Sequence, residues 1–134
     1  MIFGIGTDIV AVARMQDSLE KHGERFARRI LTDAEYDRYK EHAHPAGFLA
    51  KRFAAKEAAA KALGTGFRDG LSLQHIEVSN DVLGKPELKF YLRASELVGS
   101  LGIGASYLSL SDEKEFAVAY VVLTKAEDTS VVQH

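Results

Sequence analysis

The spacing of hydrophobic residues changes several times along this chain, and each change predicts a different secondary-structure element. The opening stretch, 2–12, is apolar and rich in β-branched residues, so it predicts a strand, although Gly4 and Gly6 interrupt it. Towards the other end of the chain, 105–111 and 116–124 predict a hairpin. The second of these two stretches is the most apolar in the chain, as expected of a central strand.

Between these strands the pattern favours helices. We expect a helix over 14–29 that breaks near Gly23. The sequence Thr-Asp-Ala-Glu at 32–35 is a capping box, in which the threonine opens a helix and the glutamate three residues later completes the cap. We expect this second helix to end near His42.

The longest predicted helix runs over 48–66 and consists mostly of Ala, Lys, Leu and Glu, which are strong helix formers. Pro45 lies just before it, where proline suits the first helical turn. Leu49, Phe53 and Ala60 fall close to one face of this helix and are expected to pack on the core. The other elements are therefore expected to be arranged around this central helix.

The remaining segments complete an α+β pattern. Stretches 73–79 and 87–92 predict strands, and 93–102 predicts a helix between strands. The order of elements favours a mostly antiparallel sheet packed on the long central helix. We expect one domain over 1–124, followed by a polar tail over 125–134 that frays.

Composition narrows the class of protein. The chain has 134 residues, 46% of them hydrophobic, with no cysteine and a formal net charge of −2. These features predict a cytoplasmic globular protein without disulfides or thiol chemistry, and they disfavour nucleic acid as a partner. No apolar run is long enough for a membrane span, and the first residues do not resemble a secretory signal. Charge is uneven: residues 14–61 carry eleven Lys/Arg and eight Asp/Glu, which suggests a local basic patch.

Two carboxylates and one lysine are the candidate chemical groups. Asp8 lies within the first predicted strand, and Glu57 lies four residues before Lys61 on the central helix. Two acids with a lysine beside a glycine-rich turn are suited to Mg²⁺-dependent phosphoryl transfer, because Mg²⁺ prefers one or two carboxylates plus phosphate and water. The alternatives are that Asp8 faces solvent at an edge and that Glu57 and Lys61 form an ordinary surface pair.

A second candidate site is a surface rich in arginine. Arg14, Arg25, Arg28 and Arg29 accompany Phe26 in the first predicted helical region. Arginines around an apolar side chain are typical of protein interfaces, and guanidinium groups bind carboxylates and phosphates in bidentate fashion. The alternative is an ordinary amphipathic surface helix whose acidic residues neutralise part of the charge.

Taken together, these segments resemble the holo-acyl-carrier-protein synthases, the small 4′-phosphopantetheinyl transferases. The resemblance extends over nearly the whole chain before the tail, in the family's order. The matching segments are GIGTDIV at 4–10, RFARRILTDAEYDRY at 25–39, FLAKRFAAKEAAAKALGTG at 48–66, LGKPEL at 83–88 and SLSDEKEFAVAYVVL at 109–123.

The resemblance implies transfer of phosphopantetheine from coenzyme A to a serine of an acyl carrier protein in fatty acid biosynthesis, with release of 3′,5′-ADP. It implies Mg²⁺ bound by Asp8 and Glu57, with both residues and Lys61 acting in catalysis and Lys61 beside the pyrophosphate. It also implies a homotrimer that holds coenzyme A between neighbouring subunits. The residues implied to line the coenzyme A groove are Arg52, Lys61, Gly64, Lys85, Pro86, Ser109 and Ser111.

By the same resemblance, the acidic helix of the carrier protein would bind the arginine-rich surface of Arg14, Arg25, Phe26, Arg28 and Arg29.

One departure from the family pattern affects the expected coenzyme A groove. The family usually has a histidine where this chain has Tyr107, and a tyrosine cannot become a cation. If that histidine contacts the phosphates of coenzyme A in the family, the affinity or the coenzyme preference is expected to differ here, whereas the reaction type is not.

Two rival functions remain open at the level of sequence. The first is a hydrolase acting on a nucleotide pyrophosphate, with water in place of the carrier serine. The second is a non-catalytic module that binds an acidic helix through its arginines. Release of 3′,5′-ADP without any carrier protein would indicate the hydrolase, and metal-independent binding without product would indicate the binding module.

Overall fold

A computed structural model of the chain describes residues 1–127. Its helices are α1 (Val12–His22), α2 (Glu24–Ile30), α3 (Asp33–Glu41), α4 (Pro45–Leu63) and α5 (Leu92–Ser100), with one 3₁₀ turn, η1 (Leu73–His75). Its strands are β1 (Ile2–Ala11), β2 (Ile76–Asn80), β3 (Pro86–Phe90), β4 (Ile103–Asp112) and β5 (Phe116–Lys125). The predicted α+β class with antiparallel pairing is confirmed.

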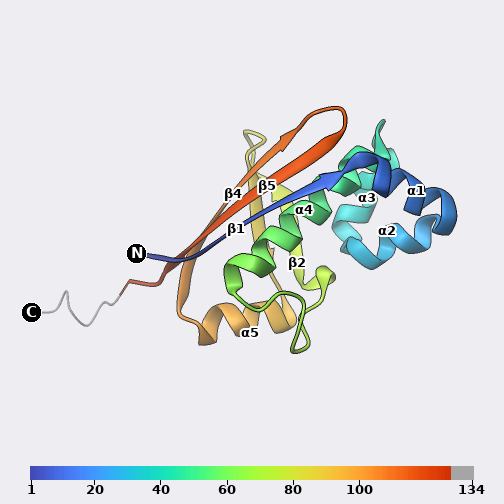
Figure 1. Cartoon of the computed structure of the whole chain (residues 1–134). Helices are drawn as coiled ribbons and strands as arrows, with labels where there is room; N and C mark the ends of the chain where they lie inside the picture. The colour runs from blue at the N-terminus through green and yellow to red at the C-terminus, as the bar shows by residue number, and fades with distance from the viewer. Residues whose placement is uncertain (128–134) are drawn as a thin grey trace, which may run out of the picture.

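The strands form two sheets rather than one. The larger sheet has the order β1-β5-β4, and the smaller one pairs β2 with β3; all pairs are antiparallel. Helix α4 lies along one face of the larger sheet, and α1, α2 and α3 gather at the end where β1 stops (Figure 1). The expectation of β5 as a central strand is therefore confirmed.

Side chains along each strand of the larger sheet point alternately to a core face and to an outer face. Ala117, Ala119, Val121 and Leu123 of β5 are fully buried against α4. The outer face carries exposed apolar and aromatic side chains from all three strands: Ile5, Ile9, Tyr107, Phe116, Val118 and Tyr120. Within a single chain, this outer face has no covering element among the described residues.

Several predicted element boundaries shift, among them that of the strand predicted over 87–92, which spans Pro86–Phe90 as β3. Helix α4 starts at Pro45, three residues before the predicted start, and stops at Leu63 because Gly64 adopts a left-handed conformation (φ 85°) and caps it. The predicted strand over 73–79 was wrong in its first half, because 73–75 form the η1 turn, capped by the Ser72 side chain. Strand β4 begins two residues before the predicted position, and α5 ends at Ser100.

The break predicted near Gly23 is confirmed: α1 ends at His22 and α2 begins at Glu24. The Thr32–Glu35 capping box is also present in full. Lys125, where the polar tail was expected to begin, is still paired in β5, and 128–134 lie outside the described residues. No helix over 1–127 combines the length and the apolar character that crossing a bilayer requires.

Candidate active site

Two glycines in β1 bring that strand into direct contact with the backbone of α4. A Cβ atom at Gly6 would lie 1.9 Å from the Ala58 carbonyl oxygen, and one at Gly4 would lie 2.1 Å from the Ala62 carbonyl oxygen. Both glycines lie on the face of β1 that points at the helix, so only a residue without a side chain fits there. The glycines that interrupt the apolar pattern of β1 therefore allow its close approach to α4.

This close approach places Asp8 beside the second half of α4. The Lys61 ammonium group donates hydrogen bonds to the Thr7 carbonyl oxygen at 3.0 Å and to Asp8 Oδ1 at 3.1 Å. The Asp8 side chain is mostly buried, whereas about half of the Lys61 side chain is exposed. The lysine thus lies at the mouth of the site and the aspartate behind it.

Glu57 belongs to the same group of charges. Partial burial raises the pKa of Glu57, and the neighbouring Asp8 carboxylate raises it further, while Lys61 and Arg14 oppose the rise. Two acids, one lysine and one arginine therefore interact at this edge of α4. The structure brings together Asp8, Glu57 and Lys61, which the sequence separates by about fifty positions.

The donor set is compatible with Mg²⁺ but cannot enclose it. Within the part of the chain that the structure describes, no three His, Asp or Glu side chains form a metal-binding group. Mg²⁺ commonly binds one or two carboxylates and takes its other ligands from water and substrate phosphates. A cation between Asp8 and Glu57 would also relieve the repulsion that raises the Glu57 pKa.

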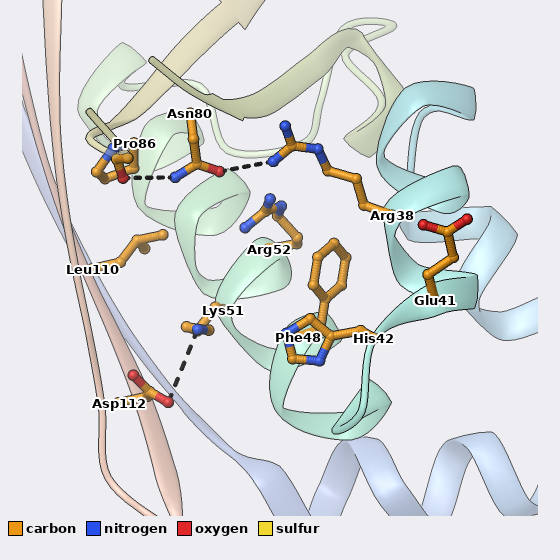
Figure 2. A pocket seen from close by; sticks show the side chains of 11 residues that line it. Arg38, Glu41, His42, Phe48, Lys51, Arg52, Asn80, Pro86, Leu110 and Asp112 are labelled. Carbon is orange, nitrogen blue, oxygen red and sulfur yellow. Dashed lines mark hydrogen bonds and ion pairs between the residues drawn. The ribbon is translucent and has the colours of Figure 1, made fainter. Parts of the chain in front are cut away.

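A separate pocket of about 530 Å³ opens against the first half of α4 (Figure 2). It contains Arg52 and Pro86, two of the residues expected to contact coenzyme A. Three cations face it, but two of them are already engaged. Arg38 donates a hydrogen bond to Asn80 Oδ1 at 3.1 Å, and Lys51 lies 3.9 Å from Asp112. The residues lining the pocket are Arg38, Glu41, His42, Phe48, Lys51, Arg52, Asn80, Gly84, Pro86, Leu110 and Asp112.

The other residues expected in the coenzyme A groove lie elsewhere in the chain. Ser109 and Ser111 lie on the outer face of the large sheet, opposite Tyr120 and Val118 in the β4–β5 register. Gly64 caps the end of α4 and Lys85 lies in the exposed turn before β3; the residues lining the Arg52 pocket include neither of them. One chain therefore presents the expected groove residues on several separate surfaces.

Lys56 is not available to a substrate, although it lies on the same helix as Glu57 and Lys61. It is completely buried, and its ammonium group donates hydrogen bonds to Glu35 Oε1 and to the Ile30 carbonyl oxygen, both at 2.6 Å. Sequence reasoning treated Glu35 only as a helix cap. Its second role, as a buried counter-ion, has no separate signal in the sequence because the partner lies 21 positions away.

The arginine-rich surface is largely formed by α2. Arg25, Arg28 and Arg29 line a shallow surface hollow, and the Arg28 guanidinium lies 3.9 Å from the centre of the Tyr36 ring. Phe26 is half-buried and packs on the core. Arg14 differs from the other three, because its charge acts on Glu57. Gln74 ties α2 to η1 through hydrogen bonds that its side-chain amide donates to the carbonyl oxygens of Arg28 and Leu31.

Comparison with known proteins identifies the family of the chain. The model of the 4′-phosphopantetheinyl transferase superfamily matches residues 4–121. A holo-acyl-carrier-protein synthase from Halorhodospira halophila is 58% identical over 123 residues, which cover 92% of this chain and 98% of the relative. A crystal structure of a holo-acyl-carrier-protein synthase from Neisseria meningitidis has a TM-score of 0.89 and 46% identity, and the match covers 93% of this chain and 100% of that one.

A third similar protein is the holo-acyl-carrier-protein synthase of Bacillus anthracis, in complex with CoA (3′,5′-ADP). Its TM-score is 0.78 at 41% identity, and the match covers 95% of this chain and 99% of the neighbour. The chain therefore belongs to the 4′-phosphopantetheinyl transferase superfamily and, within it, to the enzymes known as holo-acyl-carrier-protein synthases.

Proposed function

We propose that this enzyme transfers the 4′-phosphopantetheine group of coenzyme A to a serine of apo acyl carrier protein and releases 3′,5′-ADP. The names of its relatives and the nucleotide bound to the Bacillus anthracis neighbour support the substrates. The observation that carries the proposal is the convergence of Asp8, Glu57 and Lys61 from β1 and α4. The reaction would serve fatty acid biosynthesis in the cytoplasm.

Each side chain of this group has a distinct role. The serine oxygen of the carrier attacks the phosphorus nearest the pantetheine, and the bond to the departing 3′,5′-ADP phosphate breaks with its electron pair. Glu57 accepts the serine proton, either directly or through a bound water molecule. Lys61 stabilises the negative charge on the departing phosphate.

Asp8 and Glu57 would hold Mg²⁺, which supplies positive charge that neutralises the pyrophosphate when it is bound. The Asp8 carboxylate also anchors Lys61 through the 3.1 Å ion pair. Because the Lys61 side chain is half-exposed, its ammonium group can reach a phosphate that enters from solvent. Much of the rate would come from positioning and charge neutralisation, as in other phosphoryl transfers.

We further propose that the enzyme works as a homotrimer with coenzyme A held between neighbouring subunits. Two observations support this. The exposed apolar outer face of the large sheet is a surface suited to burial against another copy. In addition, Ser109 and Ser111 lie on that face while Arg52 and Pro86 line the pocket on its other side, so contact between chains is needed to bring such residues together.

The carrier protein is proposed to bind the arginine-rich surface through an acidic helix. Arg25, Arg28 and Arg29 are exposed on α2, and the contact of Arg28 with Tyr36 fixes that guanidinium before binding. Phe26 adds an apolar contact beside them, and Arg14 lies next to Glu57, where the carrier serine has to arrive. Arg25→Glu is expected to raise the KM for the carrier protein and to leave the KM for coenzyme A nearly unchanged.

The deciding experiment incubates the enzyme with apo acyl carrier protein, coenzyme A and Mg²⁺, followed by intact-mass spectrometry. We expect the carrier to gain one phosphopantetheine, and we expect a chelator or Glu57→Gln to abolish the gain. A parallel reaction without carrier protein tests the hydrolase alternative, because only a hydrolase would still release 3′,5′-ADP. An unmodified carrier that nevertheless binds without metal would indicate the binding module instead.

A further inference from the structure

Arg52 is a buried cation whose hydrogen-bonding capacity is unused. Its side chain is only 6% exposed, and its Nε is the one buried side-chain nitrogen or oxygen over residues 1–127 without a hydrogen-bond partner. The guanidinium lies 4.4 Å from the centre of the Phe48 ring and faces the pocket that Pro86 and Leu110 also line (Figure 2). Buried polar groups without partners are uncommon, so this one requires a reason.

Arg52 Nε has no partner because the neighbouring carboxylate, Glu35, already accepts hydrogen bonds from other groups. Glu35 Oε1 accepts hydrogen bonds from the Thr32 backbone N–H at 2.9 Å and from Lys56 Nζ at 2.6 Å. Glu35 Oε2 accepts one from the Val78 backbone N–H at 2.8 Å. Arg52 Nε lies 3.8 Å from Oε2, which is too far for a hydrogen bond.

The ion pairs follow the same pattern. Glu35 is the only carboxylate that forms an ion pair with either buried cation among the described side chains, and Glu77, the other buried carboxylate, acts on Lys56 without forming an ion pair with it. Lys56 holds the shorter of the two contacts, and its position is fixed further by the Ile30 carbonyl oxygen. Burial lowers the pKa of Lys56, and Glu35 opposes that change and favours the charged ammonium. Arg52 is therefore left with the longer contact to Glu35, and its Nε has no hydrogen-bond partner.

We propose that Lys56 is a positioning residue that occupies Glu35 and thereby keeps the Arg52 guanidinium available for a phosphate group of the nucleotide co-substrate. This inference rests on the proposed function, since it takes the pocket beside Arg52 to bind the nucleotide end of coenzyme A. Without Lys56, the Glu35 carboxylate would pair with Arg52 directly and withdraw its N–H groups from the pocket. Lys56 itself would never touch the ligand, because it is completely buried.

The test uses the full-length enzyme and adenosine 3′,5′-bisphosphate as the probe, with binding measured by isothermal titration calorimetry. Lys56→Met keeps the length of the side chain and removes its charge. We expect it to weaken binding roughly tenfold, the usual scale for one hydrogen bond to a charged group. In steady-state assays the KM for coenzyme A should rise while kcat changes little. Lys40→Met, which removes an exposed lysine of α3, is the matched control and should bind normally.

A second variant separates this role from ordinary packing. Glu35→Gln combined with Lys56→Met removes both charges of the Glu35–Lys56 ion pair, so residue 35 can no longer capture Arg52 and nucleotide affinity should return to within about twofold of wild type. A packing role for Lys56 would instead leave the double variant as weak as the single one. If Lys56→Met alone does not fold, the double variant still decides the question by its affinity.

These measurements distinguish a failure of the inference about Lys56 from a failure of the proposed function. A wild-type enzyme that binds no adenosine 3′,5′-bisphosphate would contradict the proposed function together with this inference. A wild-type enzyme that binds it, alongside a folded Lys56→Met variant with unchanged affinity, would overturn the inference alone. Arg52→Met sets the scale, and adding Lys56→Met to it should weaken binding no further, because the two residues act through one guanidinium.

Discussion

A single methyl group added at Gly6 tests how the catalytic residues are held together. In Gly6→Ala the new Cβ would lie 1.9 Å from the Ala58 carbonyl oxygen and 2.9 Å from the Ala62 backbone nitrogen. Non-bonded heavy atoms prefer separations of about 3.5 Å, so β1 has to withdraw from α4 by more than about 1 Å. Both opposing atoms belong to a helix backbone, which cannot rotate away as a side chain can.

The expected change in the free energy of unfolding of Gly6→Ala results from two opposing effects. Overpacking of this kind lowers the free energy of unfolding by about 1–3 kcal/mol. Replacing glycine by alanine restores about 0.4–1 kcal/mol by reducing the conformational freedom of the unfolded chain. The net loss should be about 1–2 kcal/mol. Moving β1 also moves Asp8 away from Lys61, and a displacement of about 1 Å in an active site lowers turnover about a hundredfold.

Urea unfolding and the carrier-modification assay measure these two effects. Gly99→Ala is the matched control, because a Cβ there meets no atom within 4 Å and the residue lies in α5, which contributes none of the expected site residues. We expect that control to be as stable as wild type or slightly more so, with normal turnover. A Gly6→Ala enzyme with wild-type stability and turnover would refute the close packing of β1 on α4.

Three further predictions follow from the buried and exposed groups. Because the pKa of Glu57 is raised in the folded state, the folded protein binds the proton of this carboxyl group more tightly than the unfolded chain does. Protonation of Glu57 therefore stabilises the fold at acid pH. This stabilisation is lost as the pH rises from the ordinary carboxyl range through the folded-state pKa. Without divalent ions, Glu57→Gln should therefore be more stable than wild type at neutral pH, and urea titrations should show the difference vanishing in acid; parallel profiles would contradict this. Glu35→Ala should cost about 3–5 kcal/mol in guanidinium unfolding, because it leaves Lys56 buried without its counter-ion, whereas Asp37→Ala breaks only an exposed pair and should cost less than about 1 kcal/mol. Val118→Asp places a charge on the exposed sheet face and should yield monomers in analytical ultracentrifugation, and an unchanged trimer would exclude that face from the interface.

Much of the fold could be predicted from the sequence because its signals are local. The capping box at 32–35, the break at Gly23 and the antiparallel hairpin of β4 and β5 each depend on neighbouring residues, and each is confirmed. The η1 turn was missed because Leu73 continues the apolar pattern of Ile76 and Val78, which fits a strand equally well. Separation of the strands into two sheets likewise depends on packing rather than on propensity.

The candidate site could likewise be predicted only in part from the sequence. Asp8, Glu57 and Lys61 were identified from residue type and from resemblance, and the reason they meet is physical: Gly4 and Gly6 allow β1 onto α4. Burial of Lys56 could not be predicted, because a lysine on a helix rich in Ala and Lys reads as solvent-exposed. Its counter-ion Glu35 was assigned to the helix cap, a local role that concealed its contact with α4.

The strand order has a consequence for how this chain is made. Strand β5 pairs with β1 on one side and β4 on the other, and the Lys125 backbone N–H donates to the Met1 carbonyl oxygen. A ribosome therefore delivers the first strand more than a hundred residues before its hydrogen-bonding neighbour. Until β5 emerges, the nascent chain holds an alanine-rich helix without the completed sheet to cover it, so the large sheet cannot form before β5 has been synthesised.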